Sequence, residues 1–238
     1  MPVHTPVVAL EDIRFRWRRA AAPCLEIAHF ALAAGERVFL QGPSGSGKST
    51  LLSLIGGVVT PERGRVQLQG IDLATLSAAQ RDRRRADHLG IVFQLFNLLP
   101  YLTALENILL PCRFSAYRRD KITARGSSPQ AEAVRLARHL DLAIEALARP
   151  ASELSVGQQQ RVAAARALIG QPALLIADEP TSALDTDRQR SFLDLLLAES
   201  AAAGSAVLFV SHDARLAQAF DRRLTLAEIN AAQGQQAP

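Results

Sequence analysis

The chain has 238 residues, of which 48% are hydrophobic and 21% charged, and its formal net charge is +4. That length can bury the core of one domain with subdomains, or of two small domains. The sequence contains no apolar run of the roughly 18 residues that span a bilayer, and its first residues lack the basic and apolar regions of a signal peptide. We therefore expect a cytoplasmic protein that reaches a membrane only through a partner.

The cysteines and the basic residues exclude further classes. Cys24 and Cys112 are isolated and lack metal-ligand spacing, so we expect reduced, partly buried thiols rather than a disulfide. The run Arg81-Asp-Arg-Arg-Arg85 would permit nucleic acid or anionic lipid as a partner. A solvated helix face explains such a run more often, and no aromatic residue interleaves with these arginines. No nucleic-acid partner is expected.

The first predicted elements are strands. Val7–Phe15 and Leu25–Leu32 resemble strands of a half-exposed antiparallel layer, and Arg65–Gln69 alternates between apolar and polar residues with period two. Between the second and third of these, Arg37–Gln41 is a short, continuous apolar run. Such runs are typical of strands that are covered on both faces, as in a parallel sheet.

A glycine-rich loop follows that buried strand. Its residues read G-P-S-G-S-G-K-S and match the phosphate-binding loop G-x-x-x-x-G-K-[ST], and Ser49–Ile55 continues as a helix. Glycines let successive N–H groups point at phosphates, and the helix N-terminus adds partial positive charge. A chance glycine turn is the alternative, which the flanking strand and helix disfavour. The residues predicted to hold a nucleoside triphosphate here are Gly42, Pro43, Ser44, Gly45, Ser46, Gly47, Lys48, Ser49 and Thr50.

Within that loop we predict two distinct roles. Lys48 would reach the β- and γ-phosphates as a compact ammonium, which the rigid fork of an arginine does not replace. The Ser49 hydroxyl would be a ligand of Mg²⁺. The predicted cofactors are therefore ATP and Mg²⁺.

Two further apolar runs end in polar residues. Ala173–Ala177 precedes Asp178 and Glu179, and Ala206–Val210 precedes Ser211-His212. In α/β sheets, ligands gather at the carboxyl ends of the strands, so we expect these ends to converge with the phosphate loop. Asp178 would support the Mg²⁺ shell and Glu179 would polarise the water that attacks the γ-phosphate. A solvated strand edge is the alternative for a pair of acids.

Between the phosphate loop and this acidic pair the pattern is helical. Val134, Ala137, Leu140, Ile144 and Leu147 recur at helical spacing. We predict an α/β phosphate-loop (RecA-like) core at 1–94 and 162–230, with an antiparallel β subdomain and an inserted α-helical subdomain at 95–161. A loose patch at 121–130 and a polar tail at 231–238 complete this single domain.

The segment Leu154-Ser-Val-Gly-Gln-Gln-Gln-Arg161 opens a helix, with Ser155 in a capping position. Together with the phosphate loop and the acidic pair, it resembles the nucleotide-binding subunit of ABC transporters over residues 8–228. In that family the helix-opening signature reads Leu-Ser-Gly-Gly-Gln, so Val156 departs from it. Since the backbone N–H of Val156 remains, we expect function to be kept.

The resemblance implies further roles. Gln94 would bind Mg²⁺ and face the membrane partner, and His212 would touch the γ-phosphate. Trp17 would stack on adenine, while Phe15 packs in the core. In a head-to-tail homodimer, the partner's ATP would be contacted by Ser155, Gly157, Gln158 and, in the loop Ser182-Ala-Leu-Asp185, by Asp185.

The segment Gly90–Ile108 is similar to macrolide-exporter and lipoprotein-release ATPases, and the Ser-Val-Gly-Gln signature to glycolipid-exporter ATPases. These resemblances imply a separate membrane permease and a periplasmic adaptor reached through it. They also imply that the chain lies on the inner face of the cell membrane. Packing of Phe96, Leu98 and Leu99 inside the helical subdomain is the alternative for part of the apolar segment 95–102, and the rest would line a groove for a short helix of that permease.

Three alternatives stay open on the sequence. Amino-acid importers share much of it, a cell-division regulator could pair the chain with a non-transporting permease-like protein, and soluble ABC ATPases act in DNA repair or translation. The basic residues 113–130 have no functional explanation in the sequence.

Overall fold

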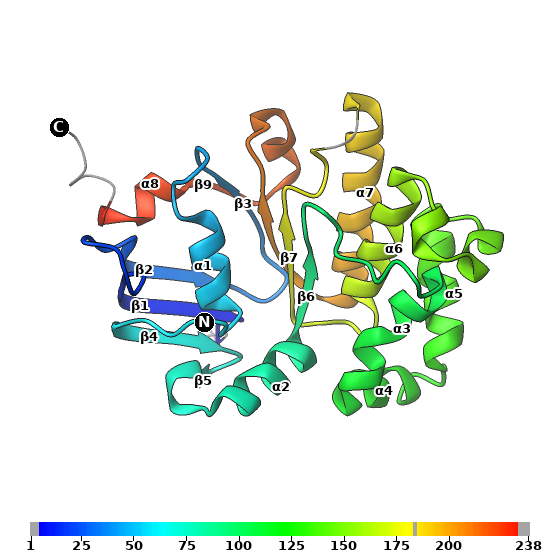
Figure 1. Ribbon diagram of the computed structural model, residues 1–238, viewed down its shortest axis with the longest axis horizontal. Coiled ribbons are helices and arrows are strands. Elements are labelled where there is room, and N and C mark those ends of the chain that lie inside the picture. The colour runs from blue at the N-terminus through cyan, green and yellow to red at the C-terminus, as the bar shows by residue number, and fades with distance from the viewer. Residues whose placement is uncertain (1–4, 183–184, 233–238) are drawn as a thin grey trace. The chain divides into compact units, whose positions relative to one another are not determined.

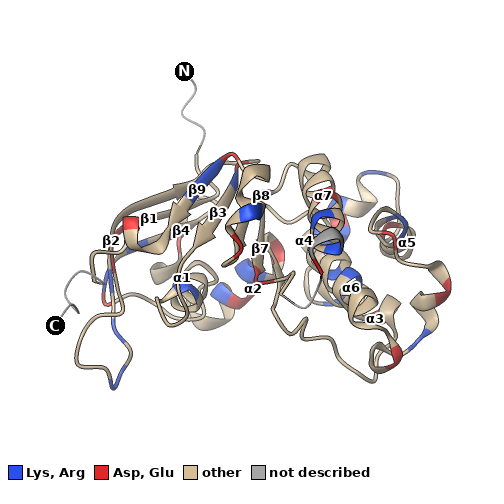
Figure 2. Cartoon of the chain, turned by 90° about the horizontal axis from the view of Figure 1, so that it is seen from above, with Lys and Arg blue, Asp and Glu red and all other residues tan. Residues whose placement is uncertain are grey.

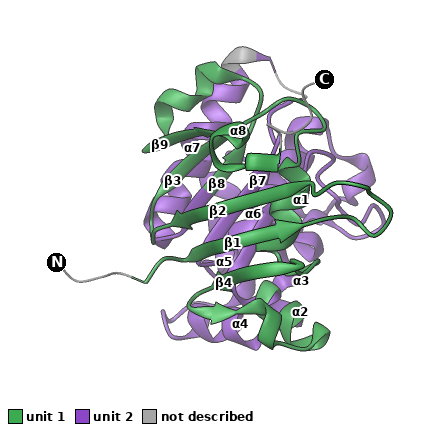
Figure 3. Cartoon of the chain, turned by 90° about the vertical axis from the view of Figure 1, so that its left-hand side faces the viewer, with its two compact units in different colours: residues 1–85, 208–238 green, residues 86–207 purple. Residues whose placement is uncertain are grey.

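The computed structural model describes residues 5–182 and 185–232. The chain divides into two compact units, residues 1–85 with 208–238 and residues 86–207 (Figure 3). Two residues of the predicted loop Ser182–Asp185, 183 and 184, therefore lie outside the described part. Most of the predicted polar tail, 233–238, also lies outside it. No helix among the described residues is long and apolar enough to cross a membrane.

The first unit contains a four-stranded antiparallel sheet in the order β2-β1-β4-β5 (Figure 1). Its strands β1 and β2 pair from Val8 opposite Leu32 to Phe15 opposite Leu25. Each of β1 and β2 combines buried with exposed side chains, which agrees with the half-exposed layer that the sequence predicts. The sheet's strands are β1 (Val8–Phe15), β2 (Leu25–Leu32), β4 (Arg63–Leu68) and β5 (Ile71–Asp72).

The rest of the first unit is built on parallel strands. Strand β3 lies between β9 and the last residues of β8, and it pairs parallel with β9 from Val38 opposite Arg222. The sequence analysis missed β9, because its four residues include two arginines and show no apolar run. The elements here are β3 (Arg37–Gln41), α1 (Lys48–Ile55), β8 (Ala206–Val210), β9 (Arg222–Thr225), α8 (Leu226–Ile229) and the 3₁₀ turns Leu73–Thr75 and Ala214–Ala219.

Helix α2 (Ala78–His88) carries the basic run, which was predicted to be a solvated face (Figure 2). Three of its arginines bind backbone carbonyl groups. Arg81 donates to Gly57 and Leu76, Arg84 to Leu68 and Gln69, and Arg85 to Gly56. No residue of α2 is buried, as a solvated face requires, and three of its guanidinium groups in addition bind carbonyl groups of the first unit.

The second unit contains the parallel strands β6 (Leu89–Val92) and β7 (Leu174–Asp178), and the first residues of β8 follow β7 in strand order. Strands β6 and β7 pair from Leu89 opposite Leu174 to Val92 opposite Ala177. Its helices are α3 (Ala104–Phe114), α4 (Ala116–Thr123), α5 (Pro129–His139), α6 (Val156–Leu168), α7 (Thr186–Ala203) and the 3₁₀ turns Ile144–Ala148 and Ala151–Glu153. The predicted α/β core with an antiparallel layer and a helical part is confirmed.

The predicted helical part, 95–161, opens with a segment that is not helical. Residues Phe96 and Asn97 adopt left-handed backbone conformations, with φ of 58° and 48°, and the first helix after them starts at Ala104. Thr103 caps that helix through a capping box with Glu106. The segment 95–103 is therefore an irregular loop.

The basic residues 113–130, for which the sequence offers no function, include a helix. Helix α4 occupies the first half of the stretch, and its Arg118 is only 1% exposed. The Arg118 guanidinium donates to the carbonyl groups of Ala86, Leu89, Ala167 and Ile169. Burial lowers the pKa of Arg118 to about 10. This arginine therefore fastens α4 to the start of β6 and to the end of α6.

Candidate functional site

The phosphate loop of the first unit connects β3 to α1. Gly45 and Gly47 have φ of 76° and 105°, conformations that favour glycine. A Cβ on Gly47 would also lie 3.2 Å from Leu25 Cδ2. Helix α1 begins at Lys48 with no side-chain cap, so no side chain takes its first N–H groups. A bare helix N-terminus behind a glycine loop is a ready-made anion site.

Lys48 is held at the centre of this loop. Its Nζ donates to the carbonyl oxygens of Gly42 at 2.6 Å and Pro43 at 2.9 Å. Both acceptors belong to the same loop, so the ammonium lies beside the backbone N–H groups that are predicted to bind the phosphates.

Trp17 lies against the first turn of α1. Its Nε1 donates to Thr50 Oγ1 at 3.3 Å, and the edge of its ring meets Phe15 with 5.1 Å between centroids. Trp17 is 47% exposed, whereas Phe15 is buried as predicted. The exposed part of the indole is available to a planar ring.

Asn230 fixes the chain just after the Trp17 loop, a contact that the sequence analysis missed. It is buried, its Nδ2 donates to the Cys24 carbonyl at 3.1 Å, and its Oδ1 accepts from the Glu26 N–H at 2.8 Å. No local pattern could reveal this contact, because it joins residues 206 and 204 positions apart.

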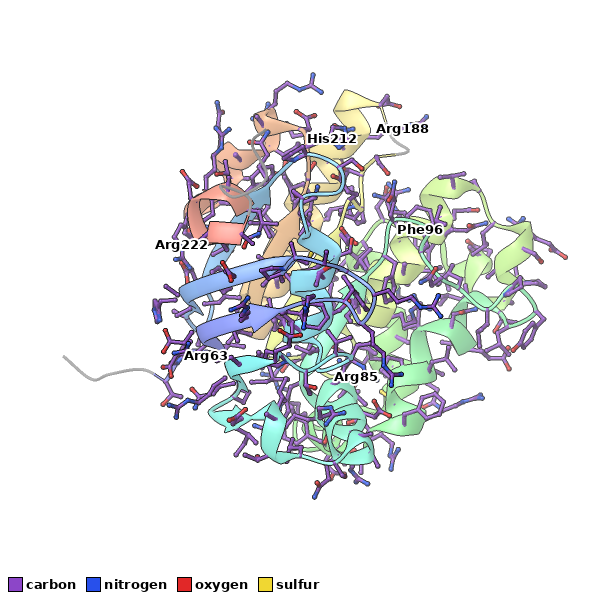
Figure 4. The ribbon with its side chains drawn as sticks, turned by 60° about the vertical axis from the view of Figure 1, so that its left-hand side comes forward. Arg63, Arg85, Phe96, Arg188, His212 and Arg222 are labelled. Carbon is purple, nitrogen blue, oxygen red and sulfur yellow. The ribbon has the colours of Figure 1, made fainter. Side chains whose placement is uncertain are left out.

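His212 follows β8 and is exposed (Figure 4). The N–H of Ser211 donates to the Leu40 carbonyl at 3.3 Å, and Gln41 Nε2 donates to the His212 carbonyl at 3.3 Å. The first unit thus places His212 beside the end of β3, where the phosphate loop begins. Within this unit, the expected meeting of strand ends is confirmed.

The second unit brings Asp178, Glu179 and Gln94 to the ends of neighbouring strands. Asp178 ends β7 and Glu179 follows it, both half-buried, and Gln94 follows the paired strand β6. Glu179 has a left-handed φ of 48°, which is uncommon for a residue with a side chain. Gln160 of α6, itself buried, donates to the Pro180 carbonyl at 2.9 Å and so fixes the chain directly after Glu179.

Helix α6 also holds the loop after Gln94. Its Arg166 donates to the carbonyl of Phe96 and, at 2.7 Å, to that of Asn97, which are the two left-handed residues of the loop. Burial lowers the pKa of Arg166. The sequence analysis identified neither Gln160 nor Arg166 as a positioning residue.

The helix-opening signature begins the same helix. Ser155 caps α6 in a capping box with Gln158, whose N–H donates to Ser155 Oγ at 3.3 Å. Val156 is 50% exposed in the first turn, and a Cβ on Gly157 would meet only the tip of Arg161. Asp185 caps α7 by accepting from the Arg188 N–H at 3.0 Å.

Comparison with known proteins agrees with this arrangement. The family model for ABC transporters matches residues 25–182. The chain is 42% identical to the lipoprotein-releasing system ATP-binding protein LolD of Anaeromyxobacter dehalogenans, over 95% of this chain and 93% of the relative. It is 43% identical to LolD of Pseudomonas fluorescens, over 83% of each chain.

Solved structures give the same result. The chain is similar to the ATP-binding cassette MJ0796, a dimer in a post-hydrolysis state bound to ADP and Pi, with a TM-score of 0.80 and 34% identity over 92% of this chain and 93% of that one. A second dimeric structure of that cassette gives a TM-score of 0.78 at 33% identity, over 92% and 94%.

Proposed function

Since the chain belongs to the ABC transporter family and is an ATP-binding, ATP-hydrolysing subunit of it, we propose that it powers a separate permease that releases or exports lipids, lipoproteins or similar amphiphiles. The observation that carries this proposal is the 42% identity to a lipoprotein-releasing ATP-binding protein over nearly the whole of both chains. The subunit would work on the inner face of the cell membrane, with a periplasmic adaptor reached through the permease.

In the first unit, the loop and its neighbours would hold the nucleotide. The backbone of Gly42–Ser49 and the Lys48 ammonium would bind the phosphates, and Trp17 would stack on adenine. His212 beside the end of β3 would donate to the γ-phosphate. The bare N-terminus of α1 supports this assignment, since no side chain competes for its N–H groups.

In the second unit, Glu179 would accept a hydrogen bond from the attacking water and orient it toward the γ-phosphate. Ser49, Asp178 and Gln94 offer hydroxyl, carboxylate and amide oxygens, which are the ligand types that Mg²⁺ prefers. The donor set therefore fits this ion, which would neutralise phosphate charge when bound.

We further propose that two copies of the chain share ATP head to tail. Ser155, Gly157, Gln158 and Asp185 of one copy would face the nucleotide of the other. In the capping box the Ser155 oxygen accepts from Gln158, so its own proton is left for a phosphate oxygen. The dimeric cassettes to which the chain is similar support this arrangement.

The loop after Gln94 would meet the permease. Its Leu95 is 82% and Tyr101 75% exposed, whereas Phe96 is buried and Leu98 and Leu99 are half-buried. Of the groove predicted from the sequence, Leu95 and Tyr101 are thus the accessible apolar part, and exposed apolar patches mark interaction sites.

Measurement of turnover and binding tests the nucleotide roles. Glu179→Gln should abolish ATPase activity but leave ATP binding intact, because the carboxylate orients water and does not hold the nucleotide. Lys48→Ala should instead weaken ATP binding, since a charge among the phosphates is lost. Near wild-type turnover by the Glu179→Gln variant would remove Glu179 from the proposed mechanism.

Co-purification from membranes tests the transport role. Leu95→Glu should abolish recovery of a permease with the chain while sparing ATP binding by the isolated subunit. Val58→Glu is the matched control, because Val58 is a comparably exposed apolar residue of the first unit. Recovery of the permease with Leu95→Glu, or of no membrane protein with the wild type, would contradict the proposal.

A further inference from the structure

The second unit contains a cavity of about 340 Å³ that none of the proposed nucleotide-site residues lines. It is bounded by α4, α5 and α7 and by the turn Gly170-Gln171, which joins α6 to β7 (Figure 1). That volume lies at the lower end of the range of small-molecule sites, about 300–1,000 Å³. The basic stretch 113–130, which the proposed function leaves unexplained, supplies one wall.

The charged groups of this cavity divide into two sets. The charge of Arg135 is already paired with carboxylates, because Arg135 donates to Glu132 at 2.9 Å and to Glu199 at 2.9 Å. Glu199 is buried and also lies 2.6 Å from His139 Nδ1, so both carboxylates already have cationic or hydrogen-bonding partners. These contacts raise the pKa of Arg135, with the hydrogen bonds that it donates to Glu132 as the largest cause.

The other two cations have no such partner. In the part of the chain that the structure describes, neither Lys121 nor Arg125 forms an ion pair with a carboxylate. Lys121 Nζ donates instead to the Gln171 carbonyl at 2.6 Å and lies 5.6 Å from the centroid of the Tyr117 ring. Burial, Arg125 and Arg118 lower the pKa of Lys121. An anion beside these two side chains would relieve their mutual repulsion.

The remaining wall of the cavity is apolar and therefore favours a ligand with an apolar body. Ile122, Leu136 and Leu168 are buried there, and Ala202 and Ala203 of α7 complete the lining. The lining carries one more cation than it has carboxylates. A monoanion matches this excess, whereas a dianionic phosphate ester would be repelled by Glu132 and Glu199.

We propose that this cavity binds a small organic monocarboxylate, with its carboxylate between Lys121 and Arg125 and its apolar body against Leu136 and Leu168. The site is separate from the nucleotide loop and is assembled by the basic helix α4. Since Gln171 is in the turn that leads to β7, the ligand would contact the chain directly before the strand that ends in Asp178.

Octanoate, labelled with ¹³C at its carboxyl carbon, is a suitable probe for a titration of the full chain by NMR. We expect octanoate to bind the wild type saturably at millimolar or lower concentration. We also expect it to raise the midpoint of thermal unfolding of the protein by a few degrees. Arg125→Ala and Lys121→Met should each weaken binding at least tenfold. Octylamine, with the same apolar body and the opposite charge, should not bind.

Two variants make the test specific to the cavity. Ala203→Leu should block binding by filling the apolar end while it keeps every charge, and Arg138→Ala, on the exposed face of α5, should bind octanoate as the wild type does. Thermal unfolding of each variant without the probe shows whether it is folded. The proposal is overturned if the wild type does not bind octanoate, or if folded Arg125→Ala and Ala203→Leu variants both bind it unchanged.

Discussion

The phosphate loop of the first unit and the loops after β6 and β7 in the second unit are held by different means. In the first, the phosphate loop is shaped by its own backbone, and Lys48 reaches a carbonyl only six residues away. In the second, side chains reach across the sequence to carbonyl groups. Gln160 binds a carbonyl 20 residues away and Arg166 one that is 70 residues away.

This difference separates binding from positioning. A loop that is held by local backbone geometry leaves its N–H groups directed at a ligand, which suits phosphate binding. In the second unit, side chains of α6 bind carbonyl groups of the loops after β6 and β7, and Arg118 binds those around the start of β6 and the end of α6. Loss of a single long side chain there should therefore disturb several segments at once, whereas a change in the phosphate loop should stay local.

The largest effect is expected at Arg118. Arg118→Met keeps much of the side-chain volume but leaves four carbonyl groups without their donor, and each buried acceptor left unpaired costs about 1–3 kcal/mol. We expect the free energy of unfolding in urea to fall by at least about 3 kcal/mol. This value allows for the removal of a buried charge, which recovers part of the loss.

Two comparisons show whether the hydrogen bonds are responsible. Arg118→Lys should recover part of the loss, because its ammonium can reach some of the same acceptors. Arg138→Met, at an exposed position of α5, should change stability by less than about 0.5 kcal/mol. An Arg118→Met variant as stable as the wild type would remove the contrast between the two units.

A smaller, local effect is expected at Gly47. Gly47→Ala places a Cβ in a left-handed conformation at φ 105°, which costs about 1–2 kcal/mol, and 3.2 Å from Leu25. We expect weaker ATP binding with little change in the stability of the second unit. The fluorescence of Trp17, the only tryptophan in the chain, can follow the ATP titration. A variant that binds ATP normally would show that this backbone conformation is not needed.

The same contrast explains what the sequence predicted. The phosphate loop, its strand and its helix were predictable, because glycine, lysine and apolar periodicity act within a few residues. The strands β1, β2, β3, β7 and β8 were predictable to within a residue or two at their ends for the same reason.

The positioning contacts could not be predicted. Arg118, Arg166 and Asn230 are polar residues whose partners are backbone carbonyl or N–H groups far along the chain, and any residue type offers such a group. The carbonyl partners of the α2 arginines could not be predicted for the same reason, since a run of arginines has the same composition whether it faces only water or also binds carbonyl groups.

The smallest effect is expected at Val156, where the signature departs from the family pattern. Its side chain is half exposed in the first turn of α6, and the capping box of Ser155 and Gln158 does not involve it. Because a ligand would use only the backbone N–H, Val156→Gly should leave ATPase activity within a few-fold. It should change the free energy of unfolding by less than about 0.5 kcal/mol, the difference in helix propensity between the two residues. A large gain in turnover would mean that valine restrains the natural enzyme. A large loss would mean that its side chain packs against the second copy. The start of α6 would then be held by that contact as well as by the capping box of Ser155 and Gln158.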